Sequence, residues 1–163
     1  METAVRFFED YGIFMIVIFS FTEYLNIPAI PGGVILPAAG VTAKLGYADF
    51  WVTLIAISVA GLIAELIIYG ISYVFSDGIK RFCMKRKKTA SVYKKTTDIL
   101  DKHGAWGLFL ARLIPIFRSF VSIPAGLLGM DIKRFIPISL AGNICYVLWN
   151  MALGYFLASV LIS

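Results

Sequence analysis

Residues 111–126 read Ala-Arg-Leu-Ile-Pro-Ile-Phe-Arg-Ser-Phe-Val-Ser-Ile-Pro-Ala-Gly, and this stretch decides the fold. It places Arg112 and Arg118 inside an otherwise apolar segment that Pro115 and Pro124 interrupt. A guanidinium within hydrocarbon is costly unless an anionic or aqueous partner meets it. Broken backbone occurs at membrane depth only where it is buried in protein or lines a cavity. The segment therefore indicates a built site for a negatively charged group inside a membrane protein.

The composition of the whole chain agrees with a membrane location. Of its 163 residues 60% are hydrophobic and only 15% are charged. A soluble domain of this length does not reach that balance, whereas a compact bundle of membrane helices does. We therefore expect one all-α integral membrane domain over residues 1–163.

The positive charge is concentrated in one segment. Residues 77–102 carry nine Lys or Arg against three Asp, which is more than the net charge of +5 of the whole chain. A short basic segment between apolar ones is the signal of a cytoplasmic loop. In so apolar a chain, contact of residues 80–95 with anionic lipid headgroups is favoured over binding of nucleic acid.

The apolar stretches predict the order of elements. Residues 27–43 carry no charge but are too short and too broken for a spanning helix, so we expect a re-entrant hairpin there. Its breaking residues are Pro28, Pro31, Gly32, Gly33 and Pro37, and those of a second hairpin are Pro115, Pro124 and Gly126. The expected order is an N-terminal helix 11–25, a first re-entrant hairpin 27–43, a transmembrane helix 50–76, a basic cytoplasmic loop 77–103, a second re-entrant hairpin 104–130 and a transmembrane helix 135–163.

Charge also predicts the orientation. With 77–103 in the cytoplasm, the helix 50–76 starts outside, and the N-terminus lies in the cytoplasm because the helix 11–25 crosses before it. The second hairpin enters from the cytoplasm, and the C-terminus lies outside. The N-terminus lacks the basic region and cleavage site of a signal peptide, so the first apolar run is expected to be retained. Cys83 and Cys145 have no disulfide or metal spacing, and we expect no metal and no cofactor.

The two halves of the sequence resemble each other. Residues 27–38 align without gaps to 114–125, and both copies carry two prolines nine residues apart. Residues 55–61 match 136–142 at five of seven positions. Each copy is a broken hairpin followed by a span, and the two enter from opposite faces. This is the inverted-repeat plan of secondary transporters, which bind substrate at the repeat interface.

Polar residues share faces of the predicted spans. One face of the first span carries Ser58, Glu65 and Tyr69, and one face of the last carries Ser139, Asn143, Tyr146 and Asn150. With Ser119 of the second hairpin, we expect Ser58, Tyr69, Asn143, Tyr146 and Asn150 to line a cavity.

Four charges dominate the candidate site, Glu23 and Glu65 against Arg112 and Arg118. One interpretation is two buried ion pairs that hold the hairpins in register. The other is a clamp in which the arginines bind phosphate, since the guanidinium fork matches phosphate oxygens. In that case the carboxylates supply the counter-charge and can exchange protons when substrate leaves.

The second-half motif, from Gly107 through Arg112, Pro115 and Arg118 to Gly126, resembles the signature of the bacterial DedA family of VTT-domain membrane proteins. The first half resembles it in Glu23, in 30–32, in 36–40, and in Gly61, Glu65 and Tyr69. The resemblance implies a bacterial plasma-membrane location, essential roles for Arg112 and Arg118, and an acidic function for Glu23 and Glu65. Gly33 departs from the family, because many members have an acidic residue there.

The resemblance also implies a function, the movement of lipids across the membrane. The substrate expected first is undecaprenyl phosphate, carried by its phosphate headgroup with proton coupling, and the alternative is phosphatidylethanolamine. A structural or assembly factor and a lipid phosphatase are the rivals. We expect no enzyme, because the single histidine, His103, lies at the predicted membrane edge rather than in the site. The sequence is compatible with a homo-oligomer.

Overall fold

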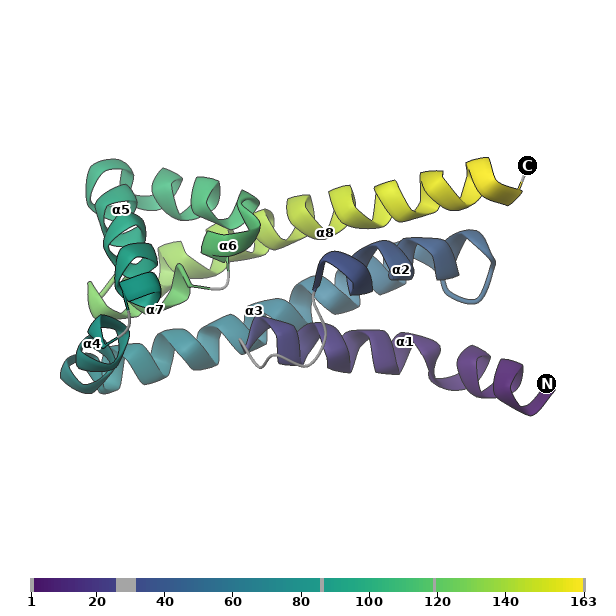
Figure 1. Cartoon of the computed structure of the whole chain (residues 1–163), viewed down its shortest axis with the longest axis horizontal. Coiled ribbons are helices and arrows are strands. Elements are labelled where there is room, and N and C mark those ends of the chain that lie inside the picture. The colour runs from purple at the N-terminus through teal and green to yellow at the C-terminus, as the bar shows by residue number, and fades with distance from the viewer. Residues whose placement is uncertain (1, 26–31, 86, 119, 163) are drawn as a thin grey trace. The chain divides into compact units, whose positions relative to one another are not determined.

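The computed structural model of the chain describes residues 2–25, 32–85, 87–118 and 120–162. In these ranges every regular element is an α-helix (Figure 1). The helices are α1 (Glu2–Tyr24), α2 (Gly32–Lys44), α3 (Phe50–Val74), α4 (Ser76–Met84), α5 (Lys87–Leu113), α6 (Pro115–Arg118), α7 (Ser122–Leu127) and α8 (Ile132–Ile162).

Helices α3 and α8 are each long and apolar enough to cross a membrane. The outward face of α3 is its most apolar one, because Val52, Ile55, Val59, Ile63 and Ile67 recur on it at three- and four-residue steps and are exposed. Its opposite face buries Ser58, Glu65 and Ser72. A soluble helix has the reverse arrangement, so α3 is built for an apolar surrounding.

Two compact units make up the chain. Unit 1 comprises residues 1–61 and 144–163, and unit 2 comprises residues 62–143. Each long helix contributes one part to each unit, so the units are described separately.

In unit 1, helices α1 and α2 lie side by side and run in opposite directions (Figure 1). Helix α2 meets α8 through glycines. Gly40 lies directly on the backbone of Met151, and Gly154 lies on the carbonyl of Pro37. Any side chain at either glycine would force the helices apart, so these small residues set the closeness of the contact.

In unit 2, helices α6 and α7 fold back along α5. Helix α5 kinks at Gly104, where φ is 52° and ψ is −127°, a conformation that only glycine adopts without strain. The helix ends at Leu113, and Pro115 begins α6 at the position where its missing N–H costs nothing. Apolar side chains from α3, α5, α7 and α8 then form one core, made of Tyr69, Leu100, Leu108, Ala111, Val121, Ala125 and Phe135.

The two long helices lie close to where the sequence predicts them. Helix α3 falls within the predicted segment 50–76, and the Asp49 carboxylate caps it by accepting a hydrogen bond of 2.8 Å from the Val52 N–H. Helix α8 begins three residues before the predicted start at 135. Asp131 explains the difference, because its carboxylate caps this helix by accepting a 3.0 Å bond from the Lys133 N–H.

Two predicted segments contain helices. The predicted basic cytoplasmic loop 77–103 holds α4 and the first part of α5. Within 27–43, residues 32–43 belong to the single helix α2, which continues through Pro37. Pro28 and Pro31, where the predicted hairpin would turn, lie outside the described residues. Helix α1 is the neighbour that runs antiparallel to α2. The sequence predicts a separate N-terminal helix that begins at residue 11, whereas α1 begins at Glu2.

This arrangement bears on the predicted topology. Because α2 runs back along α1, the N-terminus lies at the end of unit 1 where α3 begins (Figure 1). The orientation of the N-terminus and of the helix 50–76 in the membrane remains a prediction.

The contact between Tyr24 and Gly61 in unit 1 gives a test of the fold. A Cβ at Gly61 would lie 2.7–2.9 Å from the Tyr24 ring, whereas a Cβ at Gly70 of the same helix would meet nothing within 4 Å. We expect Gly61→Ala to lower the free energy of unfolding by about 1–3 kcal/mol through overpacking. Gly70→Ala should leave it unchanged or raise it, because alanine favours the helix. Thermal unfolding in detergent measures both, and equal effects would contradict the packing of Tyr24 on Gly61.

Candidate functional site: a buried arginine cradle

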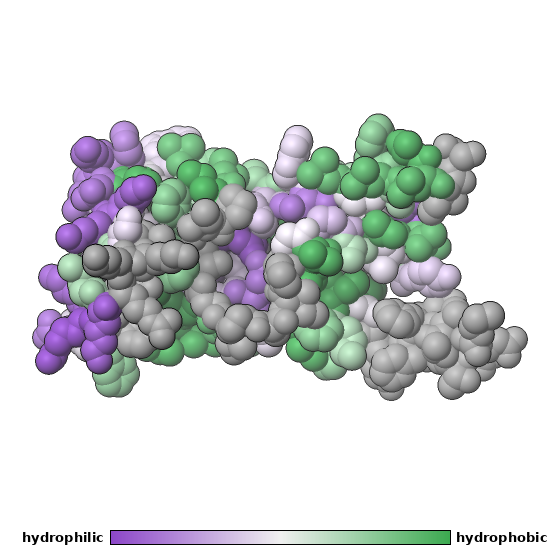
Figure 2. Space-filling view, in the orientation of Figure 1, coloured by the Kyte–Doolittle hydropathy of each residue, from purple (hydrophilic) through white to green (hydrophobic). Residues whose placement is uncertain are grey.

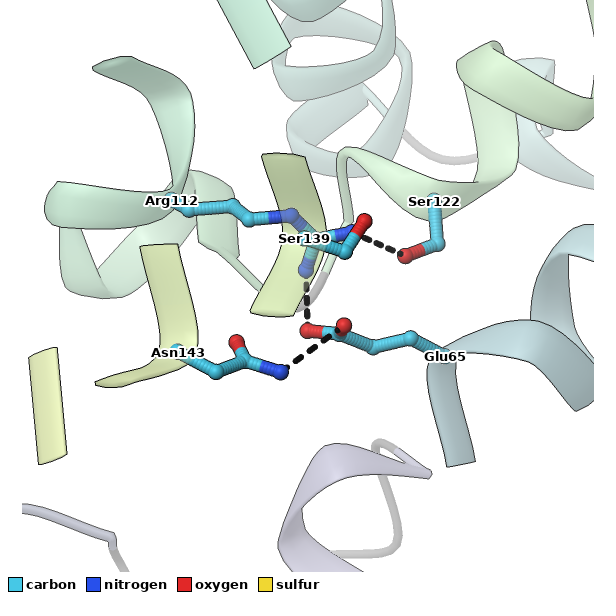
Figure 3. Close-up of polar contacts among 5 residues, drawn as sticks. All are labelled: Glu65, Arg112, Ser122, Ser139 and Asn143. Carbon is cyan, nitrogen blue, oxygen red and sulfur yellow. Dashed lines mark hydrogen bonds and ion pairs between the residues drawn. The ribbon is translucent and has the colours of Figure 1, made fainter. Parts of the chain in front are cut away.

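Arg112 lies in the last turn of α5 and is fully buried. Its Nη1 forms an ion pair with Oε1 of Glu65, which is 1% exposed on α3 (Figure 3). An isolated charge could not remain in this environment, since burying it without a partner costs several kcal/mol per ion. The pair that the sequence proposed between Glu65 and an arginine is therefore present, and its arginine is Arg112.

Two serines hold the other side of the guanidinium. The Nη2 of Arg112 donates to the hydroxyl of Ser139 on α8 at 2.8 Å and to that of Ser122 on α7 at 3.4 Å. These contacts fix the plane of the guanidinium from two directions (Figure 3). The guanidinium fork is thus preorganised, with one edge on hydroxyls and the other on a carboxylate.

Asn143 completes the shell around Glu65. Its Nδ2 donates to Oε2 of Glu65 at 3.0 Å, and Asn143 is itself fully buried (Figure 3). Both carboxylate oxygens are therefore bonded, one by Arg112 and one by Asn143.

Phe135 and Gly142 of α8 lie against the side chain of Arg112. The ring of Phe135 lies 5.2 Å from Cζ of Arg112, within the range of a cation–π contact. Gly142 leaves room for the arginine stem, because a Cβ there would lie 2.9 Å from Cδ of Arg112. These neighbours exclude water, which strengthens each charged contact inside.

Arg118 provides a second buried cation in unit 2. It ends α6 and is 1% exposed. Among the described residues of unit 2, the buried charged side chains are Glu65, Arg112 and Arg118.

The other predicted site residues serve different contacts. The hydroxyl of Ser58 donates to the Leu54 carbonyl of its own helix, and that of Tyr69 donates to the Met130 carbonyl at 2.5 Å. The Asn150 amide donates to the carbonyl of Tyr146 at 2.8 Å. Their role in lining a cavity remains a prediction.

The remaining predicted site residues are Glu23, Ser119 and the residues expected to break the hairpins. Glu23 is half-buried on α1 in unit 1, so its pairing with the arginines of unit 2 remains a prediction. Gly33 is exposed, whereas Pro124 and Gly126 are buried in α7. Ser119 lies outside the described residues. Gly32 and Pro115 begin α2 and α6.

Ser122 is the contact that the sequence did not predict. It stands ten residues after Arg112, a spacing that would not bring the two side chains together on a continuous helix. Only the return of α7 along α5 brings Ser122 next to Arg112. The paired prolines were therefore the sequence signal from which this chain reversal could have been found. Ser139 was recognised on the polar face of the last helix, although not as a partner of Arg112.

The fold and the site together define a helical membrane protein with a buried, preorganised arginine. The VTT domain profile matches residues 30–159, and the chain belongs to this family, the DedA family. Undecaprenyl phosphate transporter A of Staphylococcus aureus is 30% identical over 93% of this chain and 75% of its own length.

Two further relatives also match most of the chain. Protein DedA of Escherichia coli K12 is 29% identical over 92% of this chain and 69% of its own length. Undecaprenyl phosphate transporter A of Bacillus subtilis is 31% identical over 83% of this chain and 69% of its own length. No solved structure matches the chain significantly.

A double-mutant cycle tests the central ion pair. Glu65→Leu leaves the Arg112 charge buried without its carboxylate, and Arg112→Leu leaves the Glu65 charge in the same condition. Each should lower the free energy of unfolding by about 3–5 kcal/mol. The double variant should lose less than the larger single loss, since no unpaired charge remains. Unfolding in detergent measures the cycle, and additive losses would show that the pair does not interact.

Proposed function

We propose that this protein transports a lipid with a phosphate headgroup across the membrane, and that undecaprenyl phosphate is the substrate. The observation that carries the proposal is the buried guanidinium of Arg112, held by Ser122 and Ser139 and facing an anion. The names of two relatives, undecaprenyl phosphate transporter A, support this lipid. The isoprenoid tail stays in the bilayer while the headgroup enters the site.

In the proposed binding step, a phosphate oxygen replaces the carboxylate of Glu65 on Arg112. Carboxylate and phosphate both accept two parallel hydrogen bonds from the guanidinium fork, so they compete for the same edge. A buried ion pair gives little net stability over its desolvation cost, and exchanging one anion for another therefore requires little free energy. The two serines keep the guanidinium in place during the exchange.

The displaced carboxyl group remains next to Asn143. A carboxylate without a cation is costly in this interior, and it becomes neutral by taking up a proton. Proton uptake by Glu65 would then accompany substrate binding, and proton release would accompany the return of the ion pair. Glu23 is the second acidic group assigned to this exchange.

Arg118 suits a monophosphate ester. One guanidinium balances one phosphate charge, and a second nearby cation accommodates a doubly charged headgroup. A zwitterionic phosphatidylethanolamine headgroup would need a carboxylate for its ammonium group, and Glu65 would have to provide it. We therefore favour undecaprenyl phosphate over a zwitterionic headgroup.

The site supports binding rather than bond cleavage. Both serine hydroxyls accept hydrogen bonds from Arg112, and a serine nucleophile would instead need a general base to take its proton. We therefore assign no catalytic residue.

The basic segment provides the proposed contact with the membrane surface. Lys80, Arg81 and Lys85, at and just after α4, and Lys94 and Lys95 in α5 are exposed. The hydrophilic surface gathers over this part of unit 2 (Figure 2). Contact with anionic headgroups on the cytoplasmic side of a bacterial plasma membrane is the function that its charge supports.

Lysine substitutions separate a phosphate clamp from a simple positive charge. Arg112→Lys and Arg118→Lys keep the charge but remove the planar fork. We expect each to slow the movement of labelled undecaprenyl phosphate in proteoliposomes at least about tenfold, the equivalent of one lost charge-assisted hydrogen bond. Arg134→Lys is the matched control, since Arg134 is exposed. Unchanged transport by both site variants would refute the clamp, and no movement of lipid by the unaltered protein would refute the transporter.

A further inference from the structure

Two buried hydroxyl groups in unit 1 lack the hydrogen bonds that several other described helical hydroxyls make. Ser20 on α1 and Thr53 on α3 are fully buried, and neither side chain makes a hydrogen bond with any described residue. By contrast, five hydroxyls donate to a carbonyl of their own helix at 2.7–2.9 Å, those of Thr22, Thr42, Ser58, Thr97 and Ser159.

Both hydroxyls belong to the faces on which α1 and α3 meet. Ser20 precedes Tyr24 by one turn, and Thr53 precedes Gly61 by two turns, so each pair shares a helix face. The ring of Tyr24 lies against Gly61. Within unit 1, α1 and the first part of α3 run in the same direction (Figure 1). Ser20 and Thr53 therefore belong to the same contact between α1 and α3, and Thr53 stands in the first turn of α3.

Buried polar groups without a protein partner are the usual binding sites of internal water. Water between the two helices would satisfy both hydroxyl groups at ordinary hydrogen-bond distances. We propose that Ser20 and Thr53 bind water between α1 and α3, and that this water forms a path from the start of α3 towards Glu23.

The order of residues gives the path a direction. Thr53 stands in the first turn of α3, close to the end of unit 1, and Ser20 lies deeper. Glu23 follows Ser20 by three residues on the same side of α1, and the Tyr24 ring on Gly61 closes the inner end. The water site itself is independent of the proposed function, whereas its use in supplying protons to Glu23 rests on that function.

Few other titratable groups stand near this path. On α1, among residues 12–24, they are Glu23 and Tyr24, and residues 50–61 of α3 carry none. On the remaining helices of unit 1 they are Lys44, Cys145, Tyr146 and Tyr155, and the Lys44 ammonium lies over the ring of Tyr155 at 5.1 Å. Near the path, the described carboxyl groups of unit 1 are thus Asp49, which caps α3 one turn before Thr53, and Glu23 beyond Ser20.

Thiol accessibility in the full-length protein tests for water. In a Cys83→Ser, Cys145→Ser background, Ser20→Cys and Thr53→Cys are treated in membranes with a small water-soluble methanethiosulfonate reagent. The thiolate attacks the sulfur of the reagent, forming a mixed disulfide and releasing methanesulfinate, and the thiolate forms only where water is present. Both should react at least about tenfold faster than Thr22→Cys, whose hydroxyl is bonded within its own helix. Reaction no faster than that control, while an exposed Tyr47→Cys reacts, would overturn the proposal.

The melting temperature provides a second test, which does not depend on the reaction of a cysteine with the reagent. A dry, unpartnered hydroxyl destabilises the fold, so removing it should leave the melting temperature unchanged or raise it. A hydroxyl that binds water should show a lower melting temperature when Ser20→Ala or Thr53→Val removes that contact. We expect the lower value for both, and an unchanged or raised value for both would contradict the water site. Neither readout requires lipid transport, so a failure here is distinguishable from a failure of the proposed function.

Discussion

The ion pair between Arg112 and Glu65 is the contact on which the architecture of unit 2 depends. A guanidinium and a carboxylate can both be buried here only because α3, α5, α7 and α8 each bring a polar group to the same point. The break after Leu113 is the means by which α7 reaches this point, since a continuous helix would carry Ser122 away from Arg112. The broken backbone thus brings a hydrogen-bond partner to the buried charge of Arg112.

Close helix contacts made by glycines provide the space for the site. Gly142 admits the stem of Arg112, and Gly126 brings α7 onto the backbone of α3, where a Cβ would lie 2.9 Å from that of Ser72. Unit 1 has a contact of the same kind, with Tyr24 on Gly61. Gly61 and Gly142 occupy equivalent positions of the repeated Ile-x-Ile-Ser-x-Ala-Gly motif, so in both halves a buried side chain lies on that glycine. In unit 1 this side chain is aromatic and in unit 2 it is cationic.

Much of the site could be predicted because its signals are local. Charged residues in apolar sequence are costly, so Arg112, Arg118 and Glu65 stand out without any structure, and helical spacing places Asn143 on the polar face of the last helix. Ser122 could not be found, because its contact depends on a chain reversal. The helical state of the basic segment was missed because charge patterning reports topology rather than backbone conformation. The antiparallel arrangement of α1 and α2 was likewise not predicted, since the sequence assigned residues 27–43 to a hairpin of their own.

The account makes Glu65 the internal competitor of the lipid phosphate for Arg112, and the affinity of Glu65→Gln for undecaprenyl phosphate tests this most directly. A neutral amide keeps the shape of the side chain but no longer pairs with the guanidinium as a charge. Equilibrium binding of the labelled lipid to the purified protein in detergent should therefore become at least about tenfold tighter in the variant. Unchanged or weaker binding would contradict the competition between carboxylate and phosphate.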